Sequence, residues 1–312
     1  MNTCGARYRL SIFGESHGPA VGIVIDGLPP GFVPDMDAVA GEMARRRGGG
    51  ALSTARVEAD VPEIVSGLFA GHTTGAPLCA LFHNADTRSE DYAANLPRPG
   101  HADYTAHMKY RGFADYRGGG HFSGRLTAPL VFAGALAKQL LPAVQITAQP
   151  LLIGGSPACD DTILAAKADG DSVGGVITCV VNGLPAGLGE PFFGSVESVL
   201  SSLLFSIPAI KAVEFDEGLT LAGLRGSRSN RSPFGILGGI TTGKPLRFTV
   251  AVKPTPSIAL EQDTVDLETG QPAKITVQGR HDPCIVPRAV PVVEAAAAIG
   301  LLDLWMIGEL TL

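Results

Sequence analysis

The sequence predicts an α+β fold in which two similar halves form a single domain over residues 1–312. Two observations predict it: short motifs recur along the chain, and strand-like and helix-like segments follow in the same order in both halves. The recurring stretches are residues 21–31 with 175–187 and residues 67–78 with 235–246. We expect the pseudo-repeats, roughly residues 1–150 and 172–312, to pack about a twofold axis. Chance recurrence of Gly-Leu-Pro and Thr-Thr-Gly is the alternative.

The first half opens with a β-branched run that predicts a strand, and the Asp26-Gly27 pair after it predicts a tight turn. A helix-period segment follows, and a Thr-Thr-Gly turn then leads into a second strand-like run. The half ends in an alanine-rich segment that favours a helix. In order, the expected elements are a strand at 22–25, a helix at 36–46, a strand at 78–82 and a helix at 127–141.

The second half repeats this order, with Asn182-Gly183 in place of the first tight turn. Its expected elements are a strand at 176–181, a helix at 196–205, a strand at 246–252 and a helix at 290–305. Between the halves, residues 160–171 are polar and contain glycine, so we expect a crossover loop there. The Ser-Arg-Ser-Asn-Arg-Ser run at 227–232 predicts a further loop that faces a ligand.

Composition restricts the class of protein. The chain has 45% apolar and 17% charged residues, so few charged side chains are available to cover its surface. This composition suits a protein that buries further surface in an oligomer. The net charge of −6 argues against general nucleic-acid binding, because such binding needs a broad basic face.

Neither a membrane segment nor a targeting peptide is predicted. The first ten residues lack the continuous apolar stretch of a signal sequence. The most apolar region, 292–305, contains Glu294 and Asp303 and is too short to cross a bilayer. The five cysteines form no C-x-x-C pair, so we expect reduced thiols in a cytoplasmic protein.

Three polar segments interrupt the apolar chain, and each has a histidine near glycine, proline or aspartate. They are residues 14–18, 98–104 and 279–284. Glycine lets the backbone approach a ligand closely, and titratable side chains can move protons. Two of the segments lie in the first third of the chain and one near its end, so only folding can bring them together. We expect them to form an active site.

These segments supply candidates for proton transfer. His17 and His101 are bracketed by glycine or proline, and an imidazole titrates near neutral pH, although a lone histidine is more often structural. Asp282 precedes Pro283, on a turn that cannot continue a helix, and is the candidate base. Metal binding is the rival interpretation. Because the chain has no H-E-x-x-H motif or closely spaced ligand pair, no metal is predicted.

Three consecutive arginines indicate anion binding. Arg45, Arg46 and Arg47 close the helix expected at 36–46, and three adjacent helical side chains point in different directions. At least one should face inward, where a guanidinium can bind carboxylate or phosphate through two hydrogen bonds. Simple capping of the helix C-terminus is the alternative.

A second anion-binding candidate is the glycine-rich segment 116–125. It contains Arg117, Ser123 and Arg125 and leads into a helix, whose free backbone N–H groups would face the ligand. Glycine loops alone are weak signals. Residues 253–257, Lys-Pro-Thr-Pro-Ser, add an extended loop that can bind a polar ligand, with a plain surface turn as the alternative.

Taken together, these residues resemble the chorismate synthase family over essentially the whole chain. The motifs that carry the resemblance occur in the family's order, which makes the match specific. They are residues 13–18, 26–31, 45–47, 84–92, 98–105, 115–120, 187–191, 224–227, 235–240, 253–255 and 279–284.

The resemblance implies a sandwich of antiparallel sheets around a helical layer. It also implies an enzyme that converts 5-enolpyruvylshikimate 3-phosphate to chorismate and phosphate, the last common step of the shikimate pathway of aromatic amino acid biosynthesis. The reaction is a 1,4-anti elimination that needs reduced flavin mononucleotide (FMN) without net redox change. The implied assembly is a cytoplasmic homotetramer. Whether NADPH reduces the flavin on this protein, or another reductase does so, is left open.

The same resemblance assigns roles to residues. It implies that His17 is the acid that assists departure of phosphate, that His101 protonates or stabilises the reduced flavin, and that Asp282 assists proton removal. The implied substrate-contacting residues are Ser16, Arg45, Arg46, Arg125 and Arg280. The implied flavin-contacting residues are Arg46, His121, Phe122, Ser123, Ala209, Gly238, Lys253, Pro254, Thr255, Pro256, Ser257 and Arg280.

The chain departs from the family pattern at the flavin-contacting segments. His121 and Phe122 replace a cation and a hydroxyl, Pro208 replaces an asparagine, and the loop at 227–235 is shorter than usual. These departures motivate a second interpretation, a non-catalytic flavin- or anion-binding relative. A metal-dependent phosphatase built on the three candidate proton-transfer residues is a third.

Overall fold

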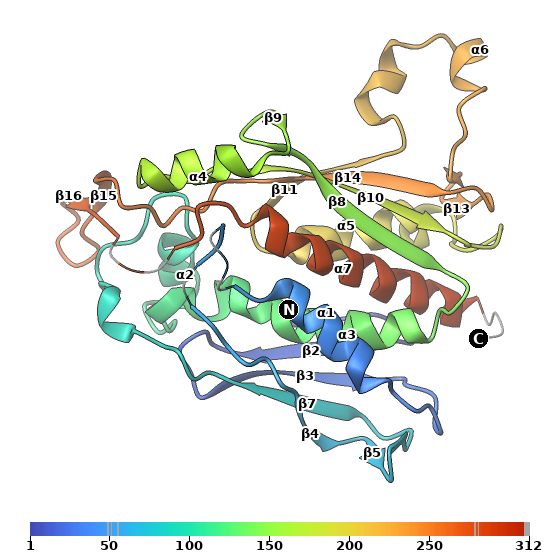
Figure 1. Ribbon diagram of the computed structural model, residues 1–312, viewed down its shortest axis with the longest axis horizontal. Coiled ribbons are helices and arrows are strands. Elements are labelled where there is room, and N and C mark those ends of the chain that lie inside the picture. Colours follow the sequence, from blue (N-terminus) through green and yellow to red (C-terminus); the bar gives the residue numbers. More distant parts are fainter. Residues whose placement is uncertain (49, 51, 55, 278, 280, 309–312) are drawn as a thin grey trace.

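The computed structural model describes residues 1–48, 50, 52–54, 56–277, 279 and 281–308. Two antiparallel five-stranded sheets enclose a layer of helices, so the molecule has the three-layer α+β architecture expected from the sequence (Figure 1). The helices are α1 (Met36–Arg46), α2 (Asp103–Lys109), α3 (Thr127–Gln139), α4 (Asp160–Ala168), α5 (Val196–Ser206), α6 (Gly226–Ser229) and α7 (Val286–Ile307). Short 3-10 turns are η1 (Ser89–Asp91), η2 (Arg117–Phe122), η3 (Gly124–Leu126), η4 (Phe192–Gly194) and η5 (Gly218–Gly223).

The two large sheets use strands from different parts of the chain. The first has the order β1 (Thr3–Cys4), β2 (Arg9–Gly14), β3 (Ala20–Asp26), β7 (Leu78–His83), β4 (Glu63–Ser66). The second has the order β11 (Ile210–Phe215), β14 (Leu246–Val252), β10 (Gly175–Asn182), β8 (Gln145–Ile153), β9 (Ser156–Pro157). Three hairpins complete the strands: β5 (Leu68–Phe69) with β6 (His72–Thr73), β12 (Ile236–Leu237) with β13 (Ile240–Thr241), and β15 (Gln262–Val265) with β16 (Pro272–Ile275).

The central strands β3 and β10 occupy corresponding places in the two sheets. β3 pairs with β7, and β10 pairs with β14, which supports the proposed relation between the two halves. On both strands every second side chain is buried, because alternate residues of a strand face opposite sides of a sheet. The fully buried side chains are Val21, Ile23 and Ile25 on β3, and Ile177, Cys179 and Val181 on β10.

Helices α3 and α7 form the centre of the helical layer and are apolar on nearly all sides. They touch where Gly134 meets Ala295: a Cβ on the glycine would lie 2.3 Å from the alanine Cβ. Only a residue without a side chain allows this approach. Farther along α7, Gly300 packs in the same way against Leu200 of α5. The two tight crossings explain why glycine stands at these positions of α3 and α7.

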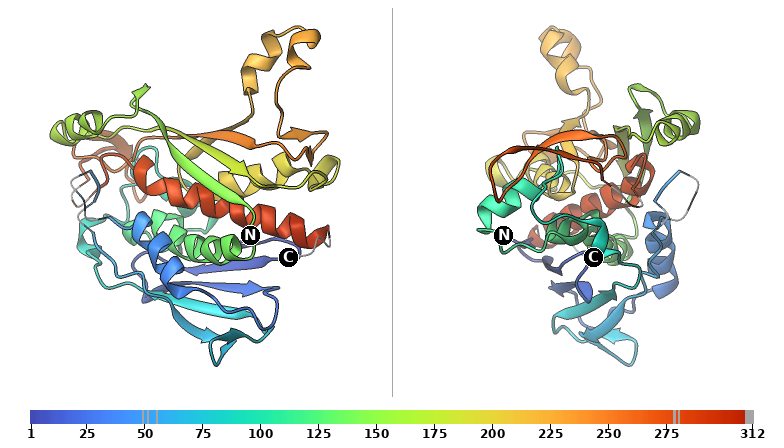
Figure 2. Two further views of the ribbon diagram at one scale, coloured as in Figure 1. Left: turned by 45° about the vertical axis from the view of Figure 1, so that its right-hand side comes forward. Right: turned by 90° about the vertical axis from the view of Figure 1, so that its left-hand side faces the viewer.

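Helix α7 is longer than the sequence predicted. It runs for 22 residues, long and apolar enough to cross a membrane, but 83% of its most apolar window is buried inside the fold. The expectation that this region is too short was wrong, because the helix starts at Val286 and a proline in its first turn is compatible with helical geometry. Its burial between the two sheets supports a core helix (Figures 1 and 2).

Glu294 is a buried acid in the middle of α7. Its carboxylate accepts hydrogen bonds from Arg45 at 2.6 and 2.8 Å, from Lys138 at 2.7 Å and from the backbone N–H of Ala148 at 2.9 Å. Burial alone would raise the pKa of Glu294, but these donors hold it below its usual value. The group therefore joins α1, α3, α7 and β8 through one charge.

Asp303 is a second carboxylate on α7, and it binds the N-terminal segment. Oδ1 accepts from the backbone N–H groups of Arg7 at 2.7 Å and Tyr8 at 2.8 Å, and Oδ2 accepts from that of Ala6 at 2.9 Å. A carboxylate that accepts several backbone N–H groups fixes the path of the chain. The turn before β2 is thereby fastened to the last helix.

Two expected loops differ in the structure. The expected crossover loop at 160–171 is mostly helix α4, which buries Ile163 and Ala166 and carries acidic residues in its first turn, where they suit the helix dipole. The segment 227–232 belongs to an arm that projects beyond the second sheet and carries η5 and α6 (Figures 1 and 2). No residue of this segment lines the cavity described below, so the expectation of a ligand-facing loop was wrong for a single chain.

Candidate active site

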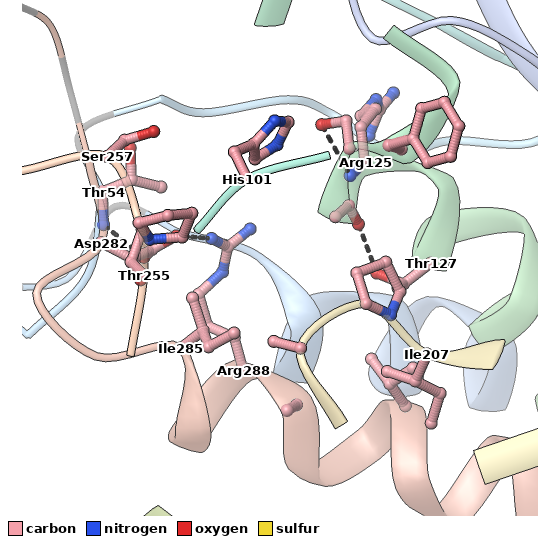
Figure 3. Close-up of a pocket in the computed structure, with 18 of the residues that line it drawn as sticks. Thr54, His101, Arg125, Thr127, Ile207, Thr255, Ser257, Asp282, Ile285 and Arg288 are labelled. Carbon is pink, nitrogen blue, oxygen red and sulfur yellow. Dashed lines mark hydrogen bonds and ion pairs between the residues drawn. The ribbon is translucent and has the colours of Figure 1, made fainter. Parts of the chain in front are cut away.

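A cavity of about 680 Å³ lies where α1 and α5 end and where α3 and α7 begin. Figure 3 shows part of its lining, with side chains from several distant segments directed toward a common space. The volume is in the range of small-molecule sites. The second polar segment lines it with Arg98 and residues 100–102, and the third with residues 281–282.

Two buried arginines share one buried carboxylate in the cavity wall. Asp60 accepts a hydrogen bond from Arg46 on Oδ2 and from Arg125 on Oδ1. Burial lowers the pKa of Arg46 to about 10, although Asp60 opposes the shift. Burial would raise the pKa of Asp60, but the two guanidinium groups hold it below its usual value. Because two cations face one acid, this wall carries excess positive charge suited to an anionic ligand.

Asp282 is held by donors on both oxygens. Oδ1 accepts from the backbone N–H of Thr54 at 2.8 Å, and Oδ2 accepts from Arg288 Nη1 at 2.5 Å (Figure 3). Arg288, in the first turn of α7, also donates from Nε to the carbonyl oxygen of Arg46 at 3.0 Å. Arg288 therefore connects the candidate base to the end of α1, beside the buried arginine pair.

A run of glycines brings the two candidate histidines to one backbone segment. Gly118, Gly119 and Gly120 have φ values of 61°, 83° and 52°, in the left-handed region that favours glycine. A Cβ on Gly118 would lie 2.4 Å from Cδ2 of His17, and one on Gly119 would lie 3.0 Å from Cε1 of His101. The glycines therefore allow the imidazoles of His17 and His101 to lie close to the backbone of this segment.

His101 lines the cavity and contacts an acid and a cation. Its Nδ1 lies 2.5 Å from Asp103 Oδ1, and Arg98 binds the same carboxylate. Arg98 also donates to Ser257 Oγ at 3.0 Å, which connects this histidine to the 253–257 loop. Burial lowers the pKa of His101, and Arg98 acts in the same direction, while Asp103 opposes both. The imidazole is therefore biased toward its neutral form.

Ser16 and His17 are not among the residues that line the cavity but lie directly behind it. Ser16 is buried, and its Oγ accepts from Arg56 Nη1 at 3.0 Å. His17 Nδ1 lies 3.1 Å from Ser89 Oγ, and its ring meets Tyr92 edge-on at 5.4 Å between centroids. Because Arg56 and Tyr92 do line the cavity, both residues border it through one intervening side chain.

Most of the flavin-contacting candidates line the cavity. Those that do are Arg46, His121, Phe122, Ser123, Ala209, Lys253, Thr255, Pro256 and Ser257. His121 is fixed by a contact of 2.8 Å between Nδ1 and the carbonyl oxygen of Gly14. Lys253 donates to the carbonyl oxygen of Gly100, next to His101. Residues 253–257 and the second polar segment are thus joined at the same wall.

Other candidates lie elsewhere. Arg45 pairs with Glu294 and Glu42 outside the cavity. Its position on α1 directs its side chain toward α7, whereas Arg46 faces the cavity. Gly238 lies in the β12–β13 hairpin, and Pro254 is not among the lining residues. Arg280 is outside the described residues.

Sequence reasoning missed several lining side chains. Arg98 lies in the second polar segment, and the clustering of Arg98, His101 and Asp103 within six positions was the available signal. Arg288 is the single cation of a mostly apolar helix, and such a residue is rarely buried without a partner. Asp60 carried no signal, because its role depends on a φ of 53° and on two arginines distant in sequence.

The cavity fits a polyanionic ligand with a flat apolar part. The Nε atoms of Arg46 and Arg47 and Oγ1 of Thr255 are buried without a hydrogen-bond partner among the described residues, so they are available to a bound molecule. Ile207 and Val292 are buried apolar residues in the same lining. These groups suit a flavin phosphate or carbonyl beside an apolar ring face.

Within the described part of the chain, no three histidine, cysteine, aspartate or glutamate side chains gather as a metal site would require. Asp282 and the two histidines have other partners: Asp282 binds Thr54 and Arg288. His101 binds Asp103, and His17 Nδ1 lies 3.1 Å from Ser89 Oγ. The arrangement is one of positioned acids, bases and cations.

Comparison with known proteins agrees with the fold. The family model described as chorismate synthase matches residues 8–306. The chain is 47% identical to a chorismate synthase of Chitinophaga pinensis, covering 99% of this chain and 98% of that protein. It is 45% identical to a chorismate synthase of Thermococcus gammatolerans, covering 96% of each.

A solved structure extends this similarity to three dimensions. The crystal structure of a chorismate synthase superposes with a TM-score of 0.75 at 24% identity, covering 98% of this chain and 93% of that one. At this identity the match demonstrates a shared fold. With the family match across nearly every described residue and relatives at this level of identity over their full length, the chain belongs to the chorismate synthase family.

Proposed function

We propose that the cavity converts 5-enolpyruvylshikimate 3-phosphate to chorismate and phosphate by 1,4-anti elimination. Family membership supports an enzyme of the lyase class in aromatic amino acid biosynthesis that acts on a small molecule. The observation that carries the proposal is the meeting of the buried Arg46–Asp60–Arg125 cluster with the restrained carboxylate of Asp282 in one cavity. A protein that only bound anions would need the cationic wall but not a fixed base.

The charge of the lining suits this substrate, which has two carboxylates and a phosphate. Cations outnumber acids among the described lining residues. The cations are Arg46, Arg47, Arg56, Arg98, Arg125, Lys211, Lys253 and Arg288, and the acids are Glu58, Asp60 and Asp282. Guanidinium groups bind carboxylate and phosphate through paired hydrogen bonds, so they orient the substrate as well as attract it.

Asp282 is the proposed proton acceptor. Two donors, Thr54 N–H and Arg288, occupy one site on each oxygen and fix the plane of the carboxylate. An ionised carboxylate has further lone pairs, and the side chain lines the cavity. Asp282 can therefore receive a proton from a ligand without losing the contacts that orient it.

His17 is the proposed proton donor to the departing phosphate. It lies behind Tyr92 and Gly118, next to Ser16, whose hydroxyl binds the cavity residue Arg56. A cation that lines the cavity and an imidazole directly behind the lining would together stabilise charge on the leaving group. His17 supplies the proton, and Arg56 helps to hold the anion.

The proposed cofactor is reduced FMN, held by Lys253, Thr255, Ser257, Ser123 and Ala209. When bound, reduced flavin supplies electron density that assists loss of phosphate. The unpartnered hydroxyl of Thr255 would donate to the flavin. His101 holds a proton on Nδ1 against Asp103 and leaves Nε2 to exchange a proton or a hydrogen bond with the ligand.

We further propose a cytoplasmic homotetramer. All five cysteines are free thiols, which supports a reducing compartment. Phe192 and Phe193 are 85% and 96% exposed side by side, which supports burial of this surface in an assembly. NADPH is a candidate reductant. Chorismate formation with FMN and NADPH, without dithionite, would distinguish self-reduction from supply by another reductase.

An anaerobic assay tests the main proposal. The protein is mixed with 5-enolpyruvylshikimate 3-phosphate and reduced FMN, and chorismate is followed by its absorbance. We expect turnover with wild type; absence of product at saturating flavin would reject the proposal. Tight binding of FMN in the presence of substrate, without turnover, would favour the non-catalytic alternative. Activity retained after exhaustive chelation would eliminate the metal-dependent phosphatase.

A further inference from the structure

We propose that Asp103 and Arg98 are positioning residues that hold His101 in a single orientation and a single tautomer at the cavity. The inference rests on the proposed function for the reaction that His101 serves. The arrangement of the three side chains can be tested separately from that reaction.

Donors occupy both oxygens of Asp103, the first residue of α2. Oδ1 accepts from His101 Nδ1 at 2.5 Å and from Arg98 Nη2 at 2.9 Å. Oδ2 accepts from Arg98 Nε at 2.7 Å and from the Arg98 backbone N–H at 3.1 Å. Charge-assisted pairs with two parallel hydrogen bonds fix orientation as well as position. The carboxylate is therefore a rigid reference point for the imidazole.

The contacts determine which nitrogen of His101 carries the proton. Nδ1 lies 3.1 Å from Arg98 Nη2, which can only donate, and 2.5 Å from an oxygen of ionised Asp103, which can only accept. The contact with the carboxylate is the shorter one, and Arg98 Nη2 already donates to the same oxygen. Nδ1 therefore donates to Asp103, and Nε2 of the neutral ring is an acceptor.

Asp103 and His101 lie on opposite sides of a thin wall. His101 lines the cavity of about 680 Å³, whereas Asp103 lines a second cavity of about 430 Å³, and Arg98 borders both. Asp103 is not among the residues that line the first cavity, so it acts on a ligand there through the two lining residues that it binds, His101 and Arg98. This placement is that of a positioning residue rather than a catalytic one.

Asp103 also keeps its charge. Burial would raise the pKa of Asp103, but hydrogen bonds from His101 and Arg98 outweigh burial and hold the pKa well below its usual range. A carboxylate that stays ionised orients an imidazole and stabilises its protonated form, but it does not pass a proton on. Among the described residues, the charged groups that act on His101 are Asp103, Arg98 and Lys253, so loss of the Asp103 charge leaves two cations there.

Arg98 extends the positioning to neighbouring parts of the site. Its Nη1 donates to Ser257 Oγ at 3.0 Å, in the proposed flavin loop. Its guanidinium lies 5.2 Å from the centroid of the Tyr92 ring, and that ring in turn packs against His17. One arginine therefore contacts the supports of both proposed proton-transfer imidazoles.

Nuclear magnetic resonance of ¹⁵N-histidine-labelled protein, combined with kinetics, tests the proposal. In wild type we expect His101 to show a protonated Nδ1. Asp103→Asn keeps the shape of the side chain but cannot accept four hydrogen bonds, so the tautomer should shift toward protonated Nε2 and the His101 titration midpoint should fall. Turnover should drop roughly 100-fold, as for a misplaced reacting group, with KM for substrate within about threefold.

Two further variants complete the design. Arg98→Lys retains the cation but removes the forked contact, so it should produce a smaller change in the same direction and serves if Asp103→Asn fails to fold. Asp26→Asn removes an acid paired with Arg9 on the first sheet and should change neither spectrum nor turnover. An unchanged His101 tautomer in a folded Asp103→Asn protein would overturn the proposal. If wild type forms no chorismate, the proposed function fails, but the spectra still decide the positioning role.

Discussion

Gly118 packs directly against the imidazole of His17, and a Cβ on the glycine would lie 2.5 Å from Nε2. The φ of Gly118, 61°, is one that side chains rarely adopt. Both the backbone turn and the place of the histidine therefore depend on the absence of a side chain. Since Gly119 holds the same relation to His101, a single turn sets the position of two imidazoles.

Gly118→Ala should displace His17 and lower turnover roughly 100-fold, the usual consequence of a small misplacement at a reacting centre. Left-handed backbone at alanine adds a cost of about 1–2 kcal/mol. Chorismate assays and thermal unfolding measure the two effects. Gly155→Ala is the matched control, because Gly155 has a φ of 82° but a Cβ there would meet nothing within 4 Å. Equal turnover in the two variants would contradict the steric explanation.

Asp60→Asn should destabilise the protein and weaken catalysis together. The substitution leaves Arg46 and Arg125 buried without a counter-charge, and breaking a buried ion pair costs about 3–5 kcal/mol. Asparagine tolerates the φ of 53° at this position, so the change isolates the charge. Denaturant unfolding measures the loss. A free energy of unfolding equal to that of wild type would show that the ion pairs of Asp60 with Arg46 and Arg125 make no net contribution to stability.

Asp282→Asn should reduce turnover by roughly two to four decades, the usual contribution of a positioned acid or base, while substrate binding is mostly kept. Thr54 N–H can still bind the amide oxygen, so the side chain stays in place without its basicity. Arg288→Lys should cost less, because a lysine keeps the charge but cannot bind both Asp282 and the Arg46 carbonyl oxygen. Steady-state kinetics compare the two, and a larger loss for Arg288→Lys would argue against Asp282 as base.

Glu294→Gln should lower stability with little effect on the proposed chemistry. The acid joins α1, α3 and β8 through Arg45, Lys138 and Ala148 and does not line the cavity. Loss of the charge leaves Glu42 as the acidic partner of Arg45 and Lys138, so we expect a loss of about 1–3 kcal/mol. Turnover per folded molecule, measured well below the unfolding temperature, should remain near that of wild type. A selective loss of turnover would reveal coupling between this cluster and the cavity.

Stability should fall in acid. Burial would raise the pKa values of Asp60 and Glu294, but their cationic partners hold both below the usual values. A carboxyl whose pKa is lower in the folded state stabilises the protein above its unfolded pKa, and this contribution is lost as pH falls through the folded pKa. We therefore expect the free energy of unfolding to decline below about pH 4. Urea unfolding across this range checks the decline, which should be shallower in Glu294→Gln.

The layers of the fold were predictable because their signals are local. The β-branched run at 22–25 predicted a strand that is part of β3, and the helix-period segment at 36–46 predicted α1. The segment at 160–171 was predicted to be a loop because it is polar, but a helix on the surface can also contain many polar residues. Only the burial of Ile163 and Ala166 against the fold distinguishes α4 from a loop.

Site residues were predictable where the residue type itself indicates the chemistry. They were less predictable where the role of a residue depends on the side chain that it binds. Resemblance identified Asp282 and His101, both of which line the cavity. It also suggested Arg45, whose guanidinium binds Glu294, because neighbouring arginines on a helix point in different directions and sequence alone does not say which faces inward. Asp60 and Arg288 act through contacts across long stretches of chain, and no local pattern encodes such pairs.

The bond between Asp303 and the N–H groups of Ala6, Arg7 and Tyr8 has a consequence for biosynthesis. A ribosome makes the N-terminal turn first and the last helix almost three hundred residues later. The turn at residues 6–8 therefore stays without these hydrogen bonds until α7 has been translated, since chains grow at only about 5–20 residues per second. Nascent chains that end before α7 would lack these hydrogen bonds to the turn that connects β1 and β2.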